Sequence, residues 1–158
     1  MQRVLITGAT GLVGQEIVKQ CHDQKIAVNY LSTSKTKLED KTNYKGFYWN
    51  PNTGEIDVNC FKDVDVIVFI VDRTQWTDED DMVLEKLQYL TIPVILAVNK
   101  VDRIQDKTTL LPRLGPLAEK MSFAEIIPLS AKQGTNVEEL EKLVLARLPE
   151  GEHYFPED

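Results

Sequence analysis

The chain has 158 residues, a length typical of one domain with a sizeable core, and its net charge of −7 argues against a nucleic-acid-binding surface. No apolar run approaches the roughly 20 residues of a membrane span, and the start MQRVLITG has no signal-peptide pattern, so we expect a cytoplasmic protein without a membrane partner. Cys21 and Cys60 form no C-x-x-C motif, so the sequence predicts no metal or redox site.

Strands and helices alternate from the beginning of the chain. The apolar run RVLIT (3–7) enters a glycine-rich turn, and apolar residues at helical spacing follow over 12–23. IAVNYL (26–31) is a second strand. GFYWN (46–50) and EIDV (55–58) flank the turn residues PNTG, which predicts a hairpin.

The alternation continues in the second part of the chain. VDVIVFIV (64–71) is apolar except for Asp65, as strands buried on both faces tend to be. Thr77 followed by Asp80 resembles a capping box and predicts the start of a helix whose apolar face carries Val83, Leu84 and Leu87. The remaining predicted elements are strands over 93–99 and 124–130, a helix over 108–121 that Gly115-Pro116 should break or kink, and a helix over 136–148.

Three glycines follow the first strand in ITGATGLVG. Gly8, Gly11 and Gly14 have the spacing G-x-x-G-x-x-G. Gly8 allows a tight turn, Gly11 lets a pyrophosphate approach the backbone, and Gly14 lets the helix pack close to the sheet. Phosphates at this turn would face the free N–H groups at the positive end of the helix. The pattern therefore predicts a dinucleotide-type site.

RVLITGATGLVGQEIVKQ resembles the start of the extended short-chain dehydrogenase/reductase family, and WNPNTGEID resembles a segment of its nucleotide-sugar-epimerase-like branch. The resemblance covers about residues 1–63 and implies an NAD(P)-binding Rossmann half. It implies a pyrophosphate site formed by Gly8, Thr10, Gly11, Leu12, Val13 and Gly14. No tyrosine has a lysine four places on, and VDRTQW replaces the small turn expected after strand four, so we expect no catalytic residue.

The loop after the second strand reads Ser32, Thr33, Ser34 and Lys35. In dinucleotide-binding folds an acidic residue at this place binds the ribose 2′-OH of NAD. Hydroxyls and a cation suit a 2′-phosphate better, so the sequence favours NADP(H) over NAD(H). The alternative interpretation is a polar loop that contacts only solvent.

Two short motifs, NKVD (99–102) and SAK (130–132), follow buried strands in the second part of the chain. From about residue 64 onward the sequence resembles the C-terminal half of the G domain of the Era GTPase family. The resemblance implies that the Asp102 carboxylate accepts two hydrogen bonds from guanine, a strong and selective pairing. It implies a guanine site formed by Asn99, Lys100, Asp102, Ser130, Ala131 and Lys132.

The catalytic parts of a GTPase are missing from the sequence. The chain has no G-x-x-x-x-G-K-[ST] loop, no switch threonine and no D-x-x-G metal loop. Without the lysine and the metal, the charge that develops in phosphoryl transfer has no stabiliser. We therefore expect no GTP hydrolysis and no bound metal, and we regard the guanine site as vestigial.

The two resemblances describe one domain over 1–158, with a Rossmann-like part (1–63) joined to an Era-like part (64–158) near residues 62–66. Strands 4, 5 and 6 lie on the same side of strand 1 in a Rossmann sheet and, by the resemblance, in the GTPase. We therefore expect an α/β fold: a doubly wound, three-layer α/β/α sandwich with a mostly parallel sheet of order 3-2-1-4-5-6, a Rossmann/P-loop hybrid.

Three functions are open at this point. We favour an engineered chimeric nucleotide-binding domain without catalytic activity, with NADP(H) or NAD(H) bound at the glycine turn. One alternative is GTP or GDP binding through NKVD and SAK without hydrolysis, and another is a folded scaffold without a ligand. The expected partner is a small-molecule nucleotide, and the sequence indicates neither a nucleic acid nor a partner protein.

Overall fold

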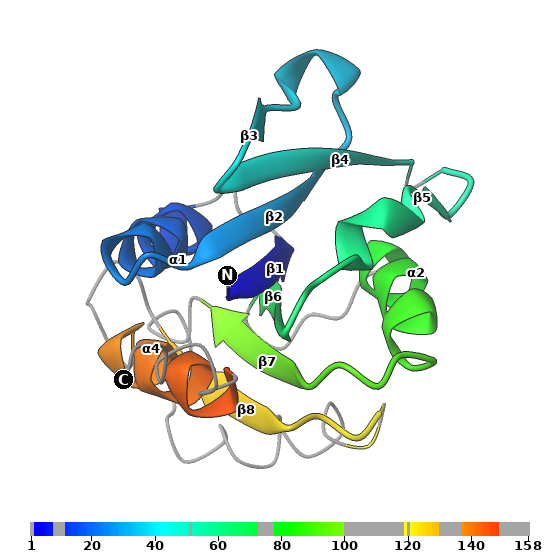
Figure 1. Cartoon of the computed structure of the whole chain (residues 1–158). Coiled ribbons are helices and arrows are strands. Elements are labelled where there is room, and N and C mark those ends of the chain that lie inside the picture. The colour runs from blue at the N-terminus through cyan, green and yellow to red at the C-terminus, as the bar shows by residue number, and fades with distance from the viewer. Residues whose placement is uncertain are drawn as a thin grey trace.

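The computed structural model describes residues 2–7, 12–50, 52–72, 78–99, 119, 121–129 and 137–148. In this part of the chain a mostly parallel sheet lies between helices on its two faces, with α1 and α4 on one side and α2 on the other (Figure 1). The expected three-layer α/β architecture is therefore confirmed.

The strands in chain order are β1 (Arg3–Thr7), β2 (Ala27–Ser32), β3 (Asp40–Lys41), β4 (Tyr44–Asn50), β5 (Glu55–Ile56), β6 (Val66–Asp72), β7 (Val94–Asn99) and β8 (Glu125–Pro128). The helices are α1 (Leu12–Asp23), α2 (Asp78–Leu87) and α4 (Val137–Arg147), with short 3₁₀ helices η1 (Lys35–Lys37) and η2 (Val58–Phe61). None of the helices in the described ranges is long and apolar enough to cross a membrane. The helix predicted over 108–121 lies almost entirely outside the described residues.

The strand order in the sheet is β3-β4-β2-β1-β6-β7-β8, and β5 pairs with β4. Because β4, β6, β7 and β8 are the strands expected as numbers 3, 4, 5 and 6, the predicted order 3-2-1-4-5-6 is confirmed. All of these strands pair in parallel, whereas β3 and β5 run antiparallel to β4. The hairpin predicted around PNTG is also present, with Trp49 opposite Ile56.

The apolar side chains of the strands fill two clusters, one on each face of the sheet. Val66 and Val68 of β6 lie in the cluster under α1 and α4, and Ile67 and Phe69 lie in the cluster under η2 and α2. This alternation explains why β6 reads as a continuous apolar run, since a strand covered on both faces has no solvent-facing side.

The helices bury the faces that their spacing predicted. Ile17 and Cys21 of α1 are buried, and so are Val83, Leu84 and Leu87 of α2. Leu140 and Val144 of α4 are buried in the same cluster as the α1 residues.

The two parts of the sequence meet in the middle of the sheet. β1 and β6 are neighbours, with Val4 opposite Val66. The Arg3 amide donates to Asp65 Oδ2 at 3.0 Å, and the Asp65 amide donates to the Arg3 carbonyl at 2.8 Å. These contacts support the expectation of one domain, which stays a prediction for unfolding experiments.

Candidate functional site

The carboxyl ends of β1, β2, β6 and β7 meet at one edge of the sheet because these strands are parallel neighbours. In open α/β sheets, ligands bind at this edge, near the point where the strand order reverses. That reversal lies between β1 and β6, where the sequence changes from the Rossmann-like to the Era-like part. We call this edge of the sheet, where a ligand is expected, the carboxyl edge.

The strand-turn-helix context of the glycine motif is present. β1 ends at Thr7 and α1 begins at Leu12, so residues 8–11 join the carboxyl edge directly to the amino end of α1. Of the predicted pyrophosphate residues, Gly8, Thr10 and Gly11 lie outside the described residues, Leu12 and Val13 form the first positions of α1, and Gly14 is buried in its first turn.

Thr7 ties the end of β1 to the neighbouring strand. Its side chain is 6% exposed, and its hydroxyl oxygen accepts a hydrogen bond from the Ile70 amide at 3.1 Å. A buried hydroxyl needs such a partner because an unpaired polar group in the core costs free energy. The bond therefore fixes the point at which the chain leaves β1 for the glycine turn.

The Ser32–Lys35 loop follows β2 at the same edge. The Ser34 amide donates to Ser32 Oγ at 3.1 Å, and Ser32 Oγ lies 3.3 Å from the Ser34 carbonyl oxygen. The Ser34 hydroxyl lies 2.9 Å from the hydroxyl of Thr36. Ser32 and Ser34 thus use their hydroxyls to build the turn, while Thr33 and Lys35 are exposed. The sequence favoured all four as residues that contact a 2′-phosphate, with a polar loop that contacts only solvent as the alternative.

Lys35 lies against an aromatic ring that the sequence analysis missed. Its ammonium nitrogen is 4.8 Å from the ring centroid of Tyr48, within the range of a cation–π interaction. Tyr48 is opposite Ser32 in the parallel β2–β4 pair, so both side chains leave the sheet on the same face. No periodic pattern relates positions 35 and 48; only the strand register brings them together.

Aromatic side chains cover the same face of β2 and β4 beside α1. The rings of Tyr30 and Tyr44 are stacked, with centroids 4.5 Å apart, and His22 of α1 meets Tyr44 edge-on at 5.7 Å. Burial, followed by the nearby Tyr30 and Glu39, raises the pKa of Tyr44. An added Cβ on Gly46 would lie 2.5 Å from the Tyr30 ring, so the ring needs glycine at that position of β4.

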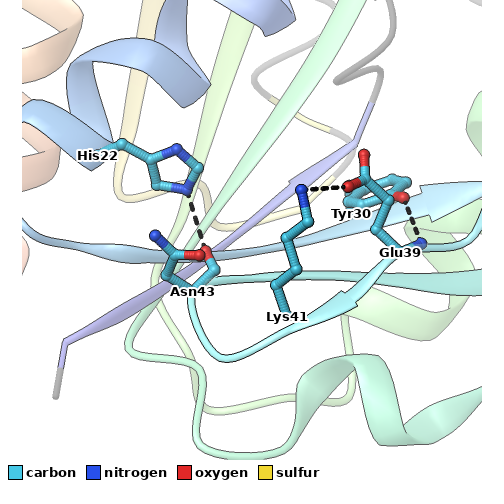
Figure 2. A network of polar contacts seen from close by, with 5 residues as sticks. All are labelled: His22, Tyr30, Glu39, Lys41 and Asn43. Atoms are coloured by element: carbon cyan, nitrogen blue, oxygen red, sulfur yellow. Dashed lines mark hydrogen bonds and ion pairs between the residues drawn. The ribbon is translucent and has the colours of Figure 1, made fainter.

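Polar contacts hold this aromatic group at both ends (Figure 2). The Glu39 amide donates to the Tyr30 hydroxyl at 2.8 Å, and the Glu39 carboxylate pairs with Lys41 at 2.9 Å. His22 Nε2 donates to the Asn43 carbonyl at 3.0 Å. These contacts attach β3 and its turn to Tyr30 and to α1. The aromatic surface of β2 and β4 beside the Ser32–Lys35 loop therefore has a defined structure.

The guanine motifs are only partly described. Asn99 is the last residue of β7, at the carboxyl edge, and its side-chain Oδ1 is buried without a hydrogen-bond partner in the described part of the chain. Lys100, Asp102, Ser130, Ala131 and Lys132 lie outside the described residues. A buried amide oxygen without a partner is costly in a folded protein, so this atom marks a place where a further group would be stabilising.

A cleft of about 560 Å³ opens at the opposite end of the sheet, where β1 begins. Within it, Arg3 Nη1 donates to Asn29 Oδ1 at 2.8 Å, and Asn29 Nδ2 donates to the Cys60 carbonyl at 3.0 Å. Its lining carries both signs of charge, from Arg3, Lys45, Lys62, Glu39, Asp40, Asp57 and Asp63. The sequence analysis did not identify this cleft, because its residues come from separate elements without a common motif.

The remaining reactive side chains are protected. Cys21 and Cys60 are buried free thiols. Burial, with a smaller effect of Glu141 on Cys21 and of Asp57 on Cys60, raises the pKa of each thiol to about 12. Both are therefore protonated near neutral pH and are poor nucleophiles. Within the described ranges, no three His, Cys, Asp or Glu side chains gather as a metal site.

Sequence comparisons relate 63% of the chain to a GTPase. The GTPase Era of Ectopseudomonas mendocina is 61% identical over 100 residues, which is 63% of this chain and 33% of that protein. The chain thus spans about a third of the length of the curated relatives that it matches. No protein-family model matches the chain.

Structural comparisons add the second relationship. A crystal structure of Era in complex with MgGDPNP and nucleotides 1506–1542 of 16S ribosomal RNA aligns with 99% of this chain and 60% of its own, with a TM-score of 0.66 and 26% identity. A Rossmann-fold NAD(P)-binding family protein from Shigella flexneri aligns with 91% of this chain and 86% of its own, with a TM-score of 0.64 at 13% identity, which indicates a shared fold alone. The chain is therefore similar in sequence to the GTPase Era over 63% of its length and has the fold of both Era and Rossmann NAD(P)-binding proteins, as expected of a chimera.

Proposed function

We propose that the chain is a nucleotide-binding domain that binds a dinucleotide at the carboxyl ends of β1 and β2, prefers NADP(H) to NAD(H), and catalyses no reaction. The observation that carries the proposal is the position of two features on neighbouring strands. The glycine turn leads from β1 into the amino end of α1, and the Ser32–Lys35 loop leaves β2 at the same edge. A dinucleotide needs these two features side by side.

The phosphate groups have a physical reason to bind here. α1 begins at Leu12, and the first amides of a helix have no partners within it and carry the positive end of its dipole. A pyrophosphate at this point would accept hydrogen bonds from them. The exposed Thr33 hydroxyl and Lys35 ammonium would then meet a 2′-phosphate on the adenosine ribose, in a loop whose shape the serines hold.

The proposal that no reaction follows rests on missing groups. The sequence has neither the Tyr-x-x-x-Lys pair of the reductases nor the P-loop lysine and metal-binding motifs of the GTPases. The nicotinamide would extend toward the end of β6, where Arg73 and Trp76 replace the small turn of the reductases. We therefore expect the adenosine diphosphate portion to supply most of the affinity.

Guanine-nucleotide binding without hydrolysis is the second candidate, and Asn99 favours it. NKVD and SAK resemble the guanine motifs of the Era family, to which 63% of the chain is similar, and the Asn99 oxygen, without a partner within the described ranges, lies at the carboxyl edge. The Era structure also holds ribosomal RNA, but the net charge of −7 of this chain argues against a nucleic-acid partner here. We propose no RNA, protein or metal partner. The cytoplasmic location of the protein stays a prediction, and so does the laboratory origin of the join between its two parts.

A thermal-shift panel with NADP⁺, NADPH, NAD⁺, GTP and GDP distinguishes the candidates. A ligand at 100 times its Kd stabilises the folded state by about 2.7 kcal/mol. For a domain of this size the Tm should rise by about 5 to 10 °C. A rise with NADP⁺ above that with NAD⁺ supports the proposal. A rise with GTP or GDP alone favours the guanine candidate, and no rise with any nucleotide indicates a scaffold.

Gly11→Val tests the position of the dinucleotide. A side chain at this position would occupy the space that the pyrophosphate needs, so NADP⁺ binding should fall by more than about 100-fold without loss of the fold. Gly54→Asn is the matched control, since Gly54 lies in the β4–β5 hairpin with a φ of 79° and no atom within 4 Å of an added Cβ. Unchanged NADP⁺ affinity in Gly11→Val contradicts the proposal.

Asp102→Ala tests the guanine candidate in the same way. If guanine binds, loss of the carboxylate that pairs with the base should remove any Tm rise with GDP, while the nearby Asp106→Ala should retain it. Phosphate release from GTP should stay at the level of the buffer with or without Mg²⁺. Release that depends on Asp102 would overturn the expectation that the chain is not an enzyme.

A further inference from the structure

We infer that Tyr48 is a positioning residue for the 2′-phosphate of NADP(H), because its ring holds the Lys35 ammonium at the carboxyl edge. The inference rests on the proposed dinucleotide function and extends it to the residue that sets the preference between the two cofactors. Tyr48 belongs to none of the motifs in the sequence, and its connection with the loop is a consequence of the β2–β4 register.

The geometry places the ring beside the start of the loop. Ser32 is the last residue of β2, and Tyr48 is its partner in β4. The chain then turns through Ser34, which has an extended backbone at φ −108° and ψ 118°, into η1, whose first residue is Lys35. This turn brings the lysine back over the neighbouring strand, with its ammonium 4.8 Å from the centre of the Tyr48 ring.

The charge of Lys35 remains available to an anion. The ion pairs within the described ranges join Glu39 to Lys41 and Glu125 to Arg147, so none of them includes Lys35. An aromatic ring attracts a cation without neutralising it. A phosphate that approaches from solvent would therefore meet a full positive charge.

Restricting the Lys35 side chain before the ligand binds should raise the affinity for NADP⁺. A free lysine side chain has many rotamers, and binding through it costs the entropy of restricting them. Tyr48 is half-buried in a strand, so its ring gives the lysine a defined surface on which to rest. The ring thus reduces the cost of ordering Lys35 for 2′-phosphate binding, and NAD⁺, which lacks that phosphate, should gain nothing from it.

The test compares NADP⁺ and NAD⁺ affinities by calorimetry in Tyr48→Leu, with Tyr48→Phe as the matched control. Leucine removes the ring but keeps an apolar side chain, whereas phenylalanine keeps the ring. We expect Tyr48→Leu to weaken NADP⁺ binding by about two- to fivefold, the size of an exposed cation–π interaction, and to leave NAD⁺ binding unchanged. Tyr48→Phe should retain the wild-type ratio of the two affinities.

A double-mutant cycle with Lys35→Ala separates positioning from a purely structural role. Lys35→Ala should weaken NADP⁺ binding by about tenfold, as expected for loss of a charged hydrogen-bond donor. Tyr48→Leu should then have no further effect on the NADP⁺ to NAD⁺ ratio in the Lys35→Ala background. Independent effects of the two substitutions contradict the inference, and so does an equal loss of both cofactors in Tyr48→Leu.

The failure of the inference differs from the failure of the proposed function. If the wild-type chain binds neither cofactor, both are overturned. If it prefers NADP⁺ and Tyr48→Leu retains that preference, only the role of Tyr48 is overturned. Thermal unfolding of each variant shows that it is folded at the titration temperature, and the Lys35→Ala variant, changed at an exposed position, tests the 2′-phosphate contact without altering the strand.

Discussion

Each part of the chain has an asparagine in a central strand, and the two asparagine side chains differ in their hydrogen bonds. Asn29 of β2, in the Rossmann-like part, is 2% exposed, and its amide accepts a hydrogen bond from Arg3 and donates one to the Cys60 carbonyl. Asn99 of β7, in the Era-like part, has a buried Oδ1 without a partner in the described ranges. Both are polar groups in an apolar sheet, where an unpaired atom costs free energy.

The difference distinguishes a structural polar group from a candidate site group. Asn29 joins β1, β2 and η2 and has a hydrogen-bond partner for both its Oδ1 and its Nδ2. Asn99 lies at the carboxyl edge, where a nucleotide would bind, and its Oδ1 has no hydrogen-bond partner within the described ranges. A sequence pattern that marks an asparagine as functional is thus strengthened when a buried polar atom of its side chain has no partner in the described fold. The predictions below test how far the two parts, and these two residues, differ.

The largest expected effect is a loss of stability that both parts of the chain share, which would show that they do not fold independently. Leu5 of β1 is fully buried in a cluster that also contains Phe69 and Leu96 of the second part. Leu5→Ala should reduce the free energy of unfolding by about 2 to 5 kcal/mol. Hydrogen exchange should show equal destabilisation of β2 and β7, because one core serves both parts.

The exposed Val58 provides the control for this experiment. It is 67% exposed in η2, so Val58→Ala should change stability by less than about 0.5 kcal/mol. Two separate unfolding transitions, or a stable proteolytic fragment released by cleavage near residue 64, would mean that the halves fold separately.

Asn29→Ala should have the next largest effect. It leaves the buried Cys60 carbonyl without its donor and removes a charged hydrogen bond from Arg3. We expect a loss of about 2 to 3 kcal/mol in denaturant unfolding. Asn59→Ala, at an exposed position of η2, should be nearly neutral; equal effects of the two substitutions would remove the structural role assigned to Asn29.

The two buried thiols predict a loss of stability at high pH. Their pKa is raised from 9.0 to about 12 in the folded chain, so the folded state keeps the protons that the unfolded state releases. The stabilisation is complete below pH 9 and is lost as the pH rises from about 9 toward 12, by about 2 kcal/mol per thiol near pH 10.5. The Tm should therefore fall between pH 8.5 and 10.5.

A variant with Cys21→Ala and Cys60→Ala isolates the contribution of the thiols, since lysine and tyrosine titrate in the same range. Its Tm should fall less between the two pH values than that of the wild type. An equal fall in both proteins would show that the thiols ionise normally in the folded chain, which would contradict their burial on the two faces of the sheet.

Asn99→Ala should have the smallest effect on stability. Its Oδ1 has no hydrogen-bond partner within the described ranges, so removal of this unpaired buried oxygen should offset the packing lost with the side chain, and the free energy of unfolding should change by less than about 0.5 kcal/mol. If a guanine nucleotide binds, the same substitution should weaken it, as measured by the GDP-induced Tm shift. A loss of stability as large as that of Asn29→Ala would mean that Asn99 is also a structural residue.

Much of the fold could be predicted from local patterns, and the exceptions share a cause. The apolar run of β6, the helical spacing in α1 and the turn chemistry of the β4–β5 hairpin are each contained in one short segment. β3 was missed because two exposed charged residues carry no periodic signal. Its position depends on its antiparallel pairing with β4, which a pattern within β3 cannot encode.

The residues of the candidate site divide in the same way, into local motifs and contacts between distant segments. The sequence by itself determined the glycine turn, the polar loop after β2 and the NKVD and SAK motifs, because each is a run of neighbouring residues with the chemistry of its ligand. Only the tertiary structure decided that the hydroxyls of Ser32 and Ser34 form hydrogen bonds within the turn, that Lys35 lies against the Tyr48 ring, and that Asn99 Oδ1 has no partner within the described ranges. These features depend on strand register and burial, which arise when distant segments pack together.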